Sequence, residues 1–184
     1  MSWNTSAILI NSRIGETPEQ CFAALGAETG ESEGNISFDE ASSLSLGGRA
    51  IAVVEDWTII FDPFMFRTLY MDSEGESKGI WPFELENRLQ ELSTGHEVVS
   101  FLIFGTSDTF GFAHFQGGEQ SRCFLFQEGA ALKQIGTVSA EEELAFAQNP
   151  GDEEQAILSL VEKLSVSWDQ IAAAEFALFQ FDEF

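Results

Sequence analysis

The chain has 184 residues, of which 31 are Asp or Glu and 8 are Lys or Arg, so its formal net charge at pH 7 is −23. A surface this acidic repels phosphate backbones, which excludes nonspecific binding to nucleic acid. Apolar residues make up 44% of the chain, which is too high for a disordered acidic tail. The length suits one globular domain.

The sequence also indicates a compartment. No apolar run reaches the roughly 18 residues that a membrane-spanning helix needs, so we expect no membrane contact. The N-terminal residues lack the cationic region of a secretory signal. Cys21 and Cys123 are lone, widely spaced thiols, which fits a reducing environment better than a disulfide scaffold. We therefore expect a cytoplasmic protein.

The first part of the chain contains a strand, a helix and a loop. Residues 6–11 form an apolar run of strand length. A helix is predicted over residues 18–25, because Thr17 can cap it and Pro18 is tolerated at its first position. Residues 27–35 are acidic and rich in Gly, and they predict a mobile loop.

A hairpin and a second helix follow. Residues 49–61 predict an antiparallel hairpin of two apolar strands that meet at a Glu-Asp pair. Residues 72–77 predict an exposed acidic turn. A helix is expected over residues 82–93, since its Leu residues recur at helical spacing and Gly95 follows as a stop signal.

The strongest pattern is a Phe-rich meander over residues 98–127, with strands at 98–104, 109–116 and 121–127. A Gly-Gly pair supplies the turn between the last two strands, because Gly tolerates positive φ at both positions. Counting back from this turn sets the register of the meander.

That register places His114 opposite Ser121. The pairing of Phe104 with Phe110 across the first loop then places Ser100 beside His114. One face becomes a core face, made of Phe104, Phe110, Leu125, Leu102, Phe112 and Cys123. The far end of that face carries a polar row of Ser100, His114 and Ser121.

The last part of the chain predicts helices with acidic first turns, where the helix dipole favours carboxylates. Residues 141–148 and 152–164 form two of them, separated by Asn-Pro-Gly. A short helix is expected over 167–171. Residues 176–181 are either a closing strand or a continuation of that helix, and periodicity does not decide between the two.

Together these elements predict an α+β fold with a single domain. The sheet is expected to be mainly antiparallel and to contain the meander over 98–127 and the hairpin over 49–61. The helices at 18–25, 82–93 and 152–164 pack on it. Most of the 18 Phe rings belong in its core, because Phe has no polar tip to place in water.

Three motifs follow one another in a fixed order. Thr-Pro-Glu-Gln at 17–20 leads to Leu-Gly-Ala at 25–27, and residues 56–63 are Asp-Trp-Thr-Ile-Ile-Phe-Asp-Pro. Residues 92–100 pass from a helix end directly into a strand. Over roughly residues 6–171 this order resembles an uncharacterised bacterial family, known as a domain of unknown function. The family has no established activity, so the resemblance implies a compact α+β fold and nothing about mechanism.

The sequence offers no pattern for a metal or a cofactor. The acidic turn at 72–77 has its Gly too early for a calcium-binding loop. The two Cys and two His residues of the chain are not paired at the spacing of zinc ligands. No Gly-rich loop opens a helix in the manner of a phosphate-binding site. We therefore expect neither a metal nor a cofactor.

One constellation could carry nucleophilic catalysis. Ser100, His114 and Ser121 would bring a hydroxyl within reach of a base, with Glu97 or Glu119 as the orienting acid. This row predicts, as an alternative function, a hydrolase. A solvent-facing sheet edge explains the same row without chemistry, and no Gly-x-Ser-x-Gly elbow supports the hydrolase.

Charge favours a different function. Acidic clusters recur along the chain, and a field of this sign steers a cationic partner and raises its association rate. We expect a non-enzymatic, immunity-like or inhibitory partner of a basic protein; a solubilising surface or an oligomerising module are the other readings. The predicted partner-facing residues are Glu141, Glu142, Glu143, Asp152, Glu153 and Glu154, with Trp81 as a partly exposed aromatic.

Overall fold

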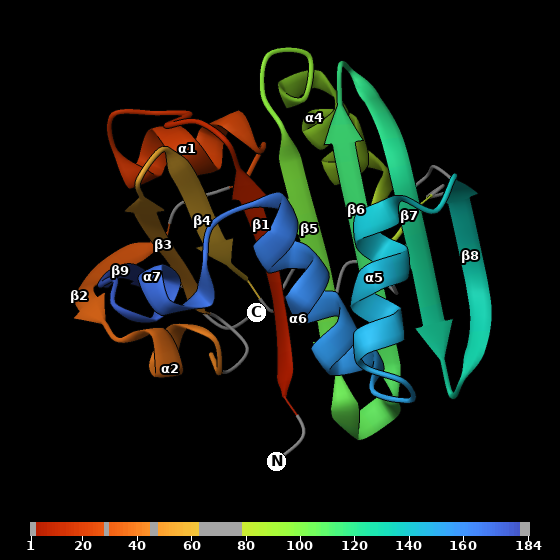
Figure 1. Cartoon of the computed structure of the whole chain (residues 1–184). Helices are drawn as coiled ribbons and strands as arrows, with labels where there is room; N and C mark the ends of the chain where they lie inside the picture. Colours follow the sequence, from red (N-terminus) through yellow and green to blue (C-terminus); the bar gives the residue numbers. More distant parts are fainter. Residues whose placement is uncertain (1–2, 28–29, 45–47, 63–78, 181–184) are drawn as a thin grey trace.

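The structure is a computed structural model, and it describes residues 3–27, 30–44, 48–62 and 79–180. These residues form one nine-stranded sheet in the order β2-β9-β3-β4-β1-β5-β6-β7-β8 (Figure 1). All neighbouring strands run antiparallel. The predicted α+β fold with an antiparallel sheet is confirmed.

The elements agree with most of the predicted positions. The strands are β1 (Asn4–Ile10), β2 (Glu31–Ile36), β3 (Gly48–Val54), β4 (Trp57–Phe61), β5 (Val98–Phe104), β6 (Thr109–Gln116), β7 (Glu119–Gln127), β8 (Ala130–Gly136) and β9 (Phe176–Gln180). The helices are α1 (Pro18–Ala24), α2 (Phe38–Ala41), α4 (Phe83–Leu92), α5 (Ala140–Gln148), α6 (Glu153–Leu164) and α7 (Trp168–Ala172). The turn predicted at 72–77 lies outside the described residues.

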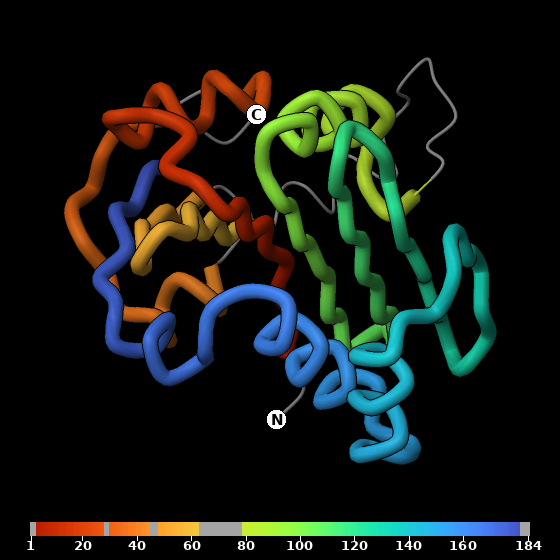
Figure 2. Tube along the Cα trace, turned by 45° about the horizontal axis from the view of Figure 1, so that its top comes forward, coloured from red at the N-terminus to blue at the C-terminus, as the bar shows by residue number. Residues whose placement is uncertain are grey.

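Helices cover both faces of the sheet. Figure 2 shows α1 and α4 on one side of the strands and α5 and α6 on the other. Consecutive residues of a strand point to opposite faces, yet Ile8, Leu9 and Ile10 of β1 are all at most 1% exposed. The central strands are therefore continuous apolar runs, as expected of a sheet that is buried on both faces.

The strands at the two edges of the sheet were not predicted from the sequence. Residues 31–36 form β2, which pairs with β9, so the predicted loop over 27–35 is wrong there. β8 forms the other edge and was not predicted either. Both strands are largely exposed, and an exposed strand lacks the apolar alternation by which strands are recognised. The open question over 176–181 is settled, because residues 176–180 are strand β9.

The predicted strands of the meander are confirmed, but the predicted register is wrong. A bulge follows the Gly-Gly turn: Phe115 pairs with Gln120 and His114 with Arg122, which leaves Ser121 as the extra residue. Every pair beyond the bulge is shifted by one position, so Phe112 lies opposite Phe124. Bulges insert one residue in this manner and re-aim the side chains that follow.

The predicted pairing of β5 with β6 is also wrong by one position, because Phe104 pairs with Thr109 and not with Phe110. A one-residue shift moves side chains to the opposite face of the sheet. Phe110 and Phe112 pack in the core beneath α5 and α6. Leu102 and Cys123, which were assigned to the same face, belong to the core beneath α1 and α4, and Phe104 and Leu125 pack against that second core. The predicted core face therefore mixes residues from two different cores.

A buried ion pair attaches α5 to the sheet. Arg122 donates from Nε and Nη2 to the two carboxylate oxygens of Glu142, at 2.7 and 2.6 Å, and the side chains are 8% and 7% exposed. Arg122 Nη1 also donates to the carbonyl oxygens of Cys123 and Ile135. Its guanidinium lies over the ring of Phe124, 5.3 Å from the centroid. One side chain thus joins β7, β8 and the first turn of α5.

Removing one member of this pair should be costly. Arg122→Met leaves the Glu142 carboxylate buried without its partner, and we expect the free energy of unfolding in urea to fall by about 3–5 kcal/mol. The double variant Arg122→Met/Glu142→Leu should recover most of that loss, because no buried charge remains. A loss below about 1 kcal/mol in the single variant would show that the pair is solvated.

Candidate functional site

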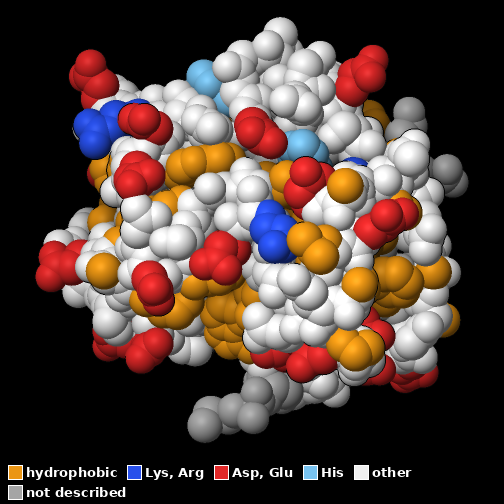
Figure 3. All heavy atoms as spheres, in the orientation of Figure 1, with side chains coloured by type: hydrophobic (Ala, Val, Ile, Leu, Met, Phe, Trp, Pro, Cys, Tyr) orange, Lys and Arg blue, Asp and Glu red, His pale blue; other side chains and the backbone are white. Residues whose placement is uncertain are grey.

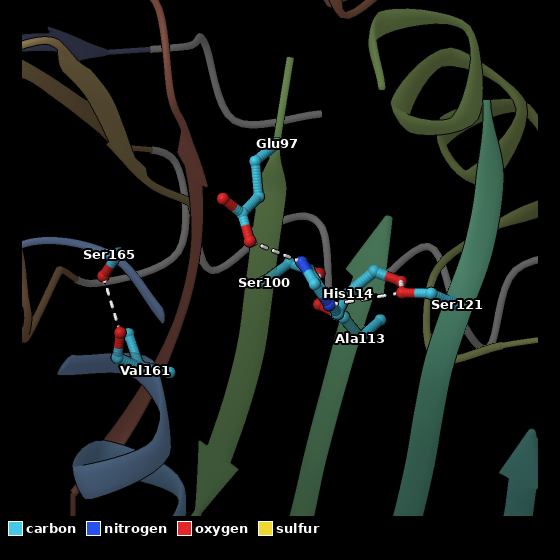
Figure 4. A network of polar contacts seen from close by, with 7 residues as sticks. All are labelled: Glu97, Ser100, Ala113, His114, Ser121, Val161 and Ser165. Carbon is cyan, nitrogen blue, oxygen red and sulfur yellow. Dashed lines mark hydrogen bonds and ion pairs between the residues drawn. The ribbon is translucent and has the colours of Figure 1, made fainter. Parts of the chain in front are cut away.

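Three polar side chains meet at one end of the sheet (Figure 4). Glu97 directly precedes β5, His114 lies near the end of β6, and Ser121 lies near the start of β7. These strands are neighbours in the sheet. His114 Nε2 lies 2.8 Å from Glu97 Oε1, and His114 Nδ1 lies 3.2 Å from Ser121 Oγ. The result is a chain of carboxylate, imidazole and hydroxyl.

Ser121 reaches His114 from the bulge in β7. As the extra residue of β7, Ser121 lies beside His114 and is exposed, while the cross-strand partner of His114 is Arg122. The side chain of His114 is 15% exposed and that of Glu97 is 29% exposed. The imidazole is therefore held by two neighbours and is largely shielded from water.

The hydrogen bonds suit both protonation states of the imidazole. When His114 is neutral, Nε2–H donates to Glu97 and Nδ1 accepts the Ser121 hydroxyl hydrogen. When His114 is protonated, Nδ1–H donates to Ser121 Oγ, and the hydroxyl hydrogen turns to the His114 carbonyl oxygen, 3.1 Å away. The neutral arrangement is the one in which an imidazole can take a proton from a serine.

Ser100 does not belong to this group, which corrects the predicted row. Ser100 is fully buried on the opposite face, where it accepts the indole N–H of Trp81 at 2.8 Å and donates to the Ala113 carbonyl at 3.3 Å. The one-residue error in register placed it beside His114. Of the two acids proposed to orient the histidine, Glu97 contacts it.

Trp81 is fully buried, so its predicted exposure is also wrong. Besides the indole bond to Ser100, its backbone N–H donates to the Glu86 carboxylate at 3.3 Å. A buried Trp needs a partner for its N–H, and Ser100 supplies it. Ser100 and Trp81 thus act as a structural pair between β5 and the start of α4.

The acids predicted to face a partner do not form one patch. Glu142 forms a buried ion pair with Arg122, so its assignment to the surface is wrong. Glu141 and Glu143 are exposed at the start of α5, whereas Asp152 is exposed before α6. The two helices run in opposite directions (Figure 1), so their acidic first turns lie at opposite ends of the helix pair. Glu153 and Glu154 share the second end and are half-buried.

On the face shown in Figure 3, acidic side chains are spread around the molecule with apolar patches between them. Few cations interrupt them. Arg49 pairs with the fully buried Asp62, and Arg122 pairs with Glu142, so two of the chain's 8 cations neutralise internal carboxylates.

Two cavities have walls that do not include His114. One of about 240 Å³ lies beside α1, β3 and β9, and its walls include Arg13, Glu16 and Glu175. The other, of about 220 Å³, lies between α4 and the β6–β7 pair, with Glu86 and Gln120 in its wall.

Among the described residues, no group of three or more His, Cys, Asp or Glu side chains is placed to hold a metal ion. In the same part of the chain, none of the helices has the length and apolar character needed to cross a membrane. No family model, no curated protein and no solved structure matches the chain. The resemblance to an uncharacterised bacterial family therefore stays a prediction.

Both cysteines should be inert in the folded protein. Cys21 and Cys123 are free and buried, and burial raises the pKa of both thiols, that of Cys123 to about 12. At pH 8 the thiolate fraction of Cys123 is then about 10³ times lower than that of an ordinary thiol, since the reactive form is the thiolate. Iodoacetamide labelling at pH 8 should be correspondingly slow in buffer and fast in urea. Rapid labelling of Cys123 in buffer would contradict its burial.

Proposed function

We propose that the chain is a non-enzymatic, cytoplasmic module that binds a basic protein, as an immunity-like or inhibitory partner. The observation that supports this is the distribution of charge. The pairs Arg49–Asp62 and Arg122–Glu142 are each neutral, so the net charge of −23 falls on the side chains outside them. Because two of the 8 cations pair with internal carboxylates, fewer remain to balance the acidic side chains of the surface.

A surface of this kind acts through long-range attraction. It steers a cationic protein toward itself and raises the association rate, and the effect weakens as salt screens the charges. The buried thiols of Cys21 and Cys123 support the cytoplasmic assignment, because unpaired cysteines are characteristic of reducing compartments.

Binding should be salt-dependent and should involve the side of the molecule that carries α5 and α6. The tagged chain should recover a basic protein from host lysate at about 0.05 M salt and release it at about 0.5 M. Removing three exposed acids near α5 and α6 should lower the affinity for that protein by roughly tenfold, because each surface ion pair contributes up to about 1 kcal/mol. The variant is Glu141→Gln/Glu143→Gln/Asp152→Asn.

The matched control removes the same number of exposed acids from β2 and α2, at the other side of the sheet, with the variant Glu31→Gln/Glu33→Gln/Asp39→Asn. It should bind nearly as the unaltered chain does. An equal loss in both variants would indicate attraction by net charge without a defined site. Recovery of no basic protein at either salt concentration would contradict the proposed function.

A second candidate function is hydrolysis with Ser121 as the nucleophile. It rests on one observation, the contact of His114 with both Glu97 and Ser121. In this reading the neutral imidazole accepts the Ser121 proton through Nδ1, and Glu97 holds the ring in place through Nε2. The hydroxyl is exposed and open to a substrate.

A serine-directed fluorophosphonate separates the two functions. The binding function predicts no covalent adduct after long incubation near pH 8, because a serine hydroxyl from which no base removes the proton is a poor nucleophile. Labelling that disappears in both Ser121→Ala and His114→Gln would establish the hydrolase instead. Ser100→Ala is the matched control, since that hydroxyl is buried against Trp81.

A further inference from the structure

β8 ends the sheet on one side. Of the described strands it pairs with β7 alone, so its outer side carries backbone N–H and C=O groups that no described strand receives. Such an edge is a template for another extended segment, and partners use it by adding a strand. The opposite edge, β2, carries Glu31 and Glu33 within the strand, and charges on an edge oppose pairing.

The region around β8 lacks acids. Residues 129–140 contain no Asp or Glu, although 31 of the 184 residues are acidic. This stretch and the neighbouring α5 present large apolar side chains to solvent. Leu132 on β8 is 54% exposed, Val138 beyond it is 45% exposed, and Leu144 on α5 is 48% exposed.

Acids stand at both ends of this apolar strip. Glu128 is exposed in the turn before β8, and Glu141 and Glu143 are exposed in the first turn of α5, just after it. Arg122 fixes this arrangement, because it binds both the Ile135 carbonyl on β8 and the Glu142 carboxylate on α5. The edge therefore has acids at each end and none between them, and its middle carries exposed apolar side chains together with Lys133, which donates to the Gly79 carbonyl oxygen, and Gln134.

We propose that β8 is the docking edge for the basic partner and that an extended segment of the partner adds to it as a further strand. This inference rests on the proposed function. The bound segment has β-branched or apolar residues in its middle and Lys or Arg at both ends. Because β8 has 7 residues, the basic ends are about seven residues apart, a span of roughly 23 Å at strand rise.

The negative charge of the chain favours a basic segment over a second copy of the chain as the partner that binds β8. Two copies that met at β8 would bring together two chains that each have a net charge of −23, with Glu128 and Glu141 of each copy at the same junction. Like charges placed opposite one another oppose association. A segment with basic ends meets the same acids with attraction.

Two synthetic peptides of equal charge test the proposal with the full-length chain. Both carry Lys-Lys at each end. The first has a central run of alternating Thr and Val, and the second has Pro at every other central position, which prevents strand pairing. In fluorescence anisotropy at low salt, the first peptide should bind at least about tenfold more tightly than the second.

Leu132→Glu should abolish that preference, because it replaces an exposed apolar side chain on the edge with a carboxylate. Val53→Glu is the matched control: Val53 is an exposed apolar residue on β3, at 38% exposure, and the added charge is the same. It should keep the preference for the first peptide. Circular dichroism of both variants confirms that each remains folded.

The outcomes separate the two proposals. Equal binding of both peptides would overturn docking at β8 and leave the proposed attraction to basic proteins intact. Binding of neither peptide at low salt would contradict both. A preference for the first peptide that survives Leu132→Glu and is lost in Val53→Glu would place the docking site away from β8 and overturn this inference.

Discussion

Hydrogen bonds from Arg122 connect β7, the strand that carries it, with β8 and α5. Its guanidinium binds the Glu142 carboxylate of α5 in a two-point contact and donates to carbonyl oxygens of β7 and β8. A buried carboxylate is tolerated when it is paired and hydrogen-bonded, and a two-point contact with Arg is the geometry that satisfies it. The position of α5 over the sheet, and of its exposed acids beside β8, depends on this contact.

The same logic operates at the other half of the sheet. Asp62 is fully buried just after β4 and pairs with Arg49 of β3, while its carbonyl oxygen accepts the Ser6 hydroxyl of β1 at 2.7 Å. In a chain with so few cations, both pairs serve to compensate internal carboxylates. Two of the cations therefore pair with internal carboxylates and are not available to balance the acids of the surface.

Sequence patterns predicted the buried elements well. The apolar runs of β1, β3 and β4 and the apolar stripe of α6 follow directly from burial, so periodicity reveals them. Patterns failed where burial is absent or where one residue is inserted. β2 and β8 are exposed edges without alternation, and nothing in the residues around Ser121 marks it as the extra residue of a bulge.

The pairing of β5 with β6 also decides the candidate site. Phe104 faces Thr109 and not Phe110, so Ser100 supports Trp81 on the face opposite His114, and Glu97 contacts the histidine instead. Glu142 was misassigned for a different reason, because a carboxylate in a helix first turn looks exposed unless its arginine partner on a distant strand is known.

The central claim is that a basic protein docks along β8 and the first turn of α5. Amide hydrogen exchange of the full chain, alone and with the basic protein recovered at low salt, tests it most directly. We expect slower exchange on binding across residues 130–144, because added strand pairing protects edge N–H groups. Protection confined to β2 and α2, or no change along β8, would contradict it.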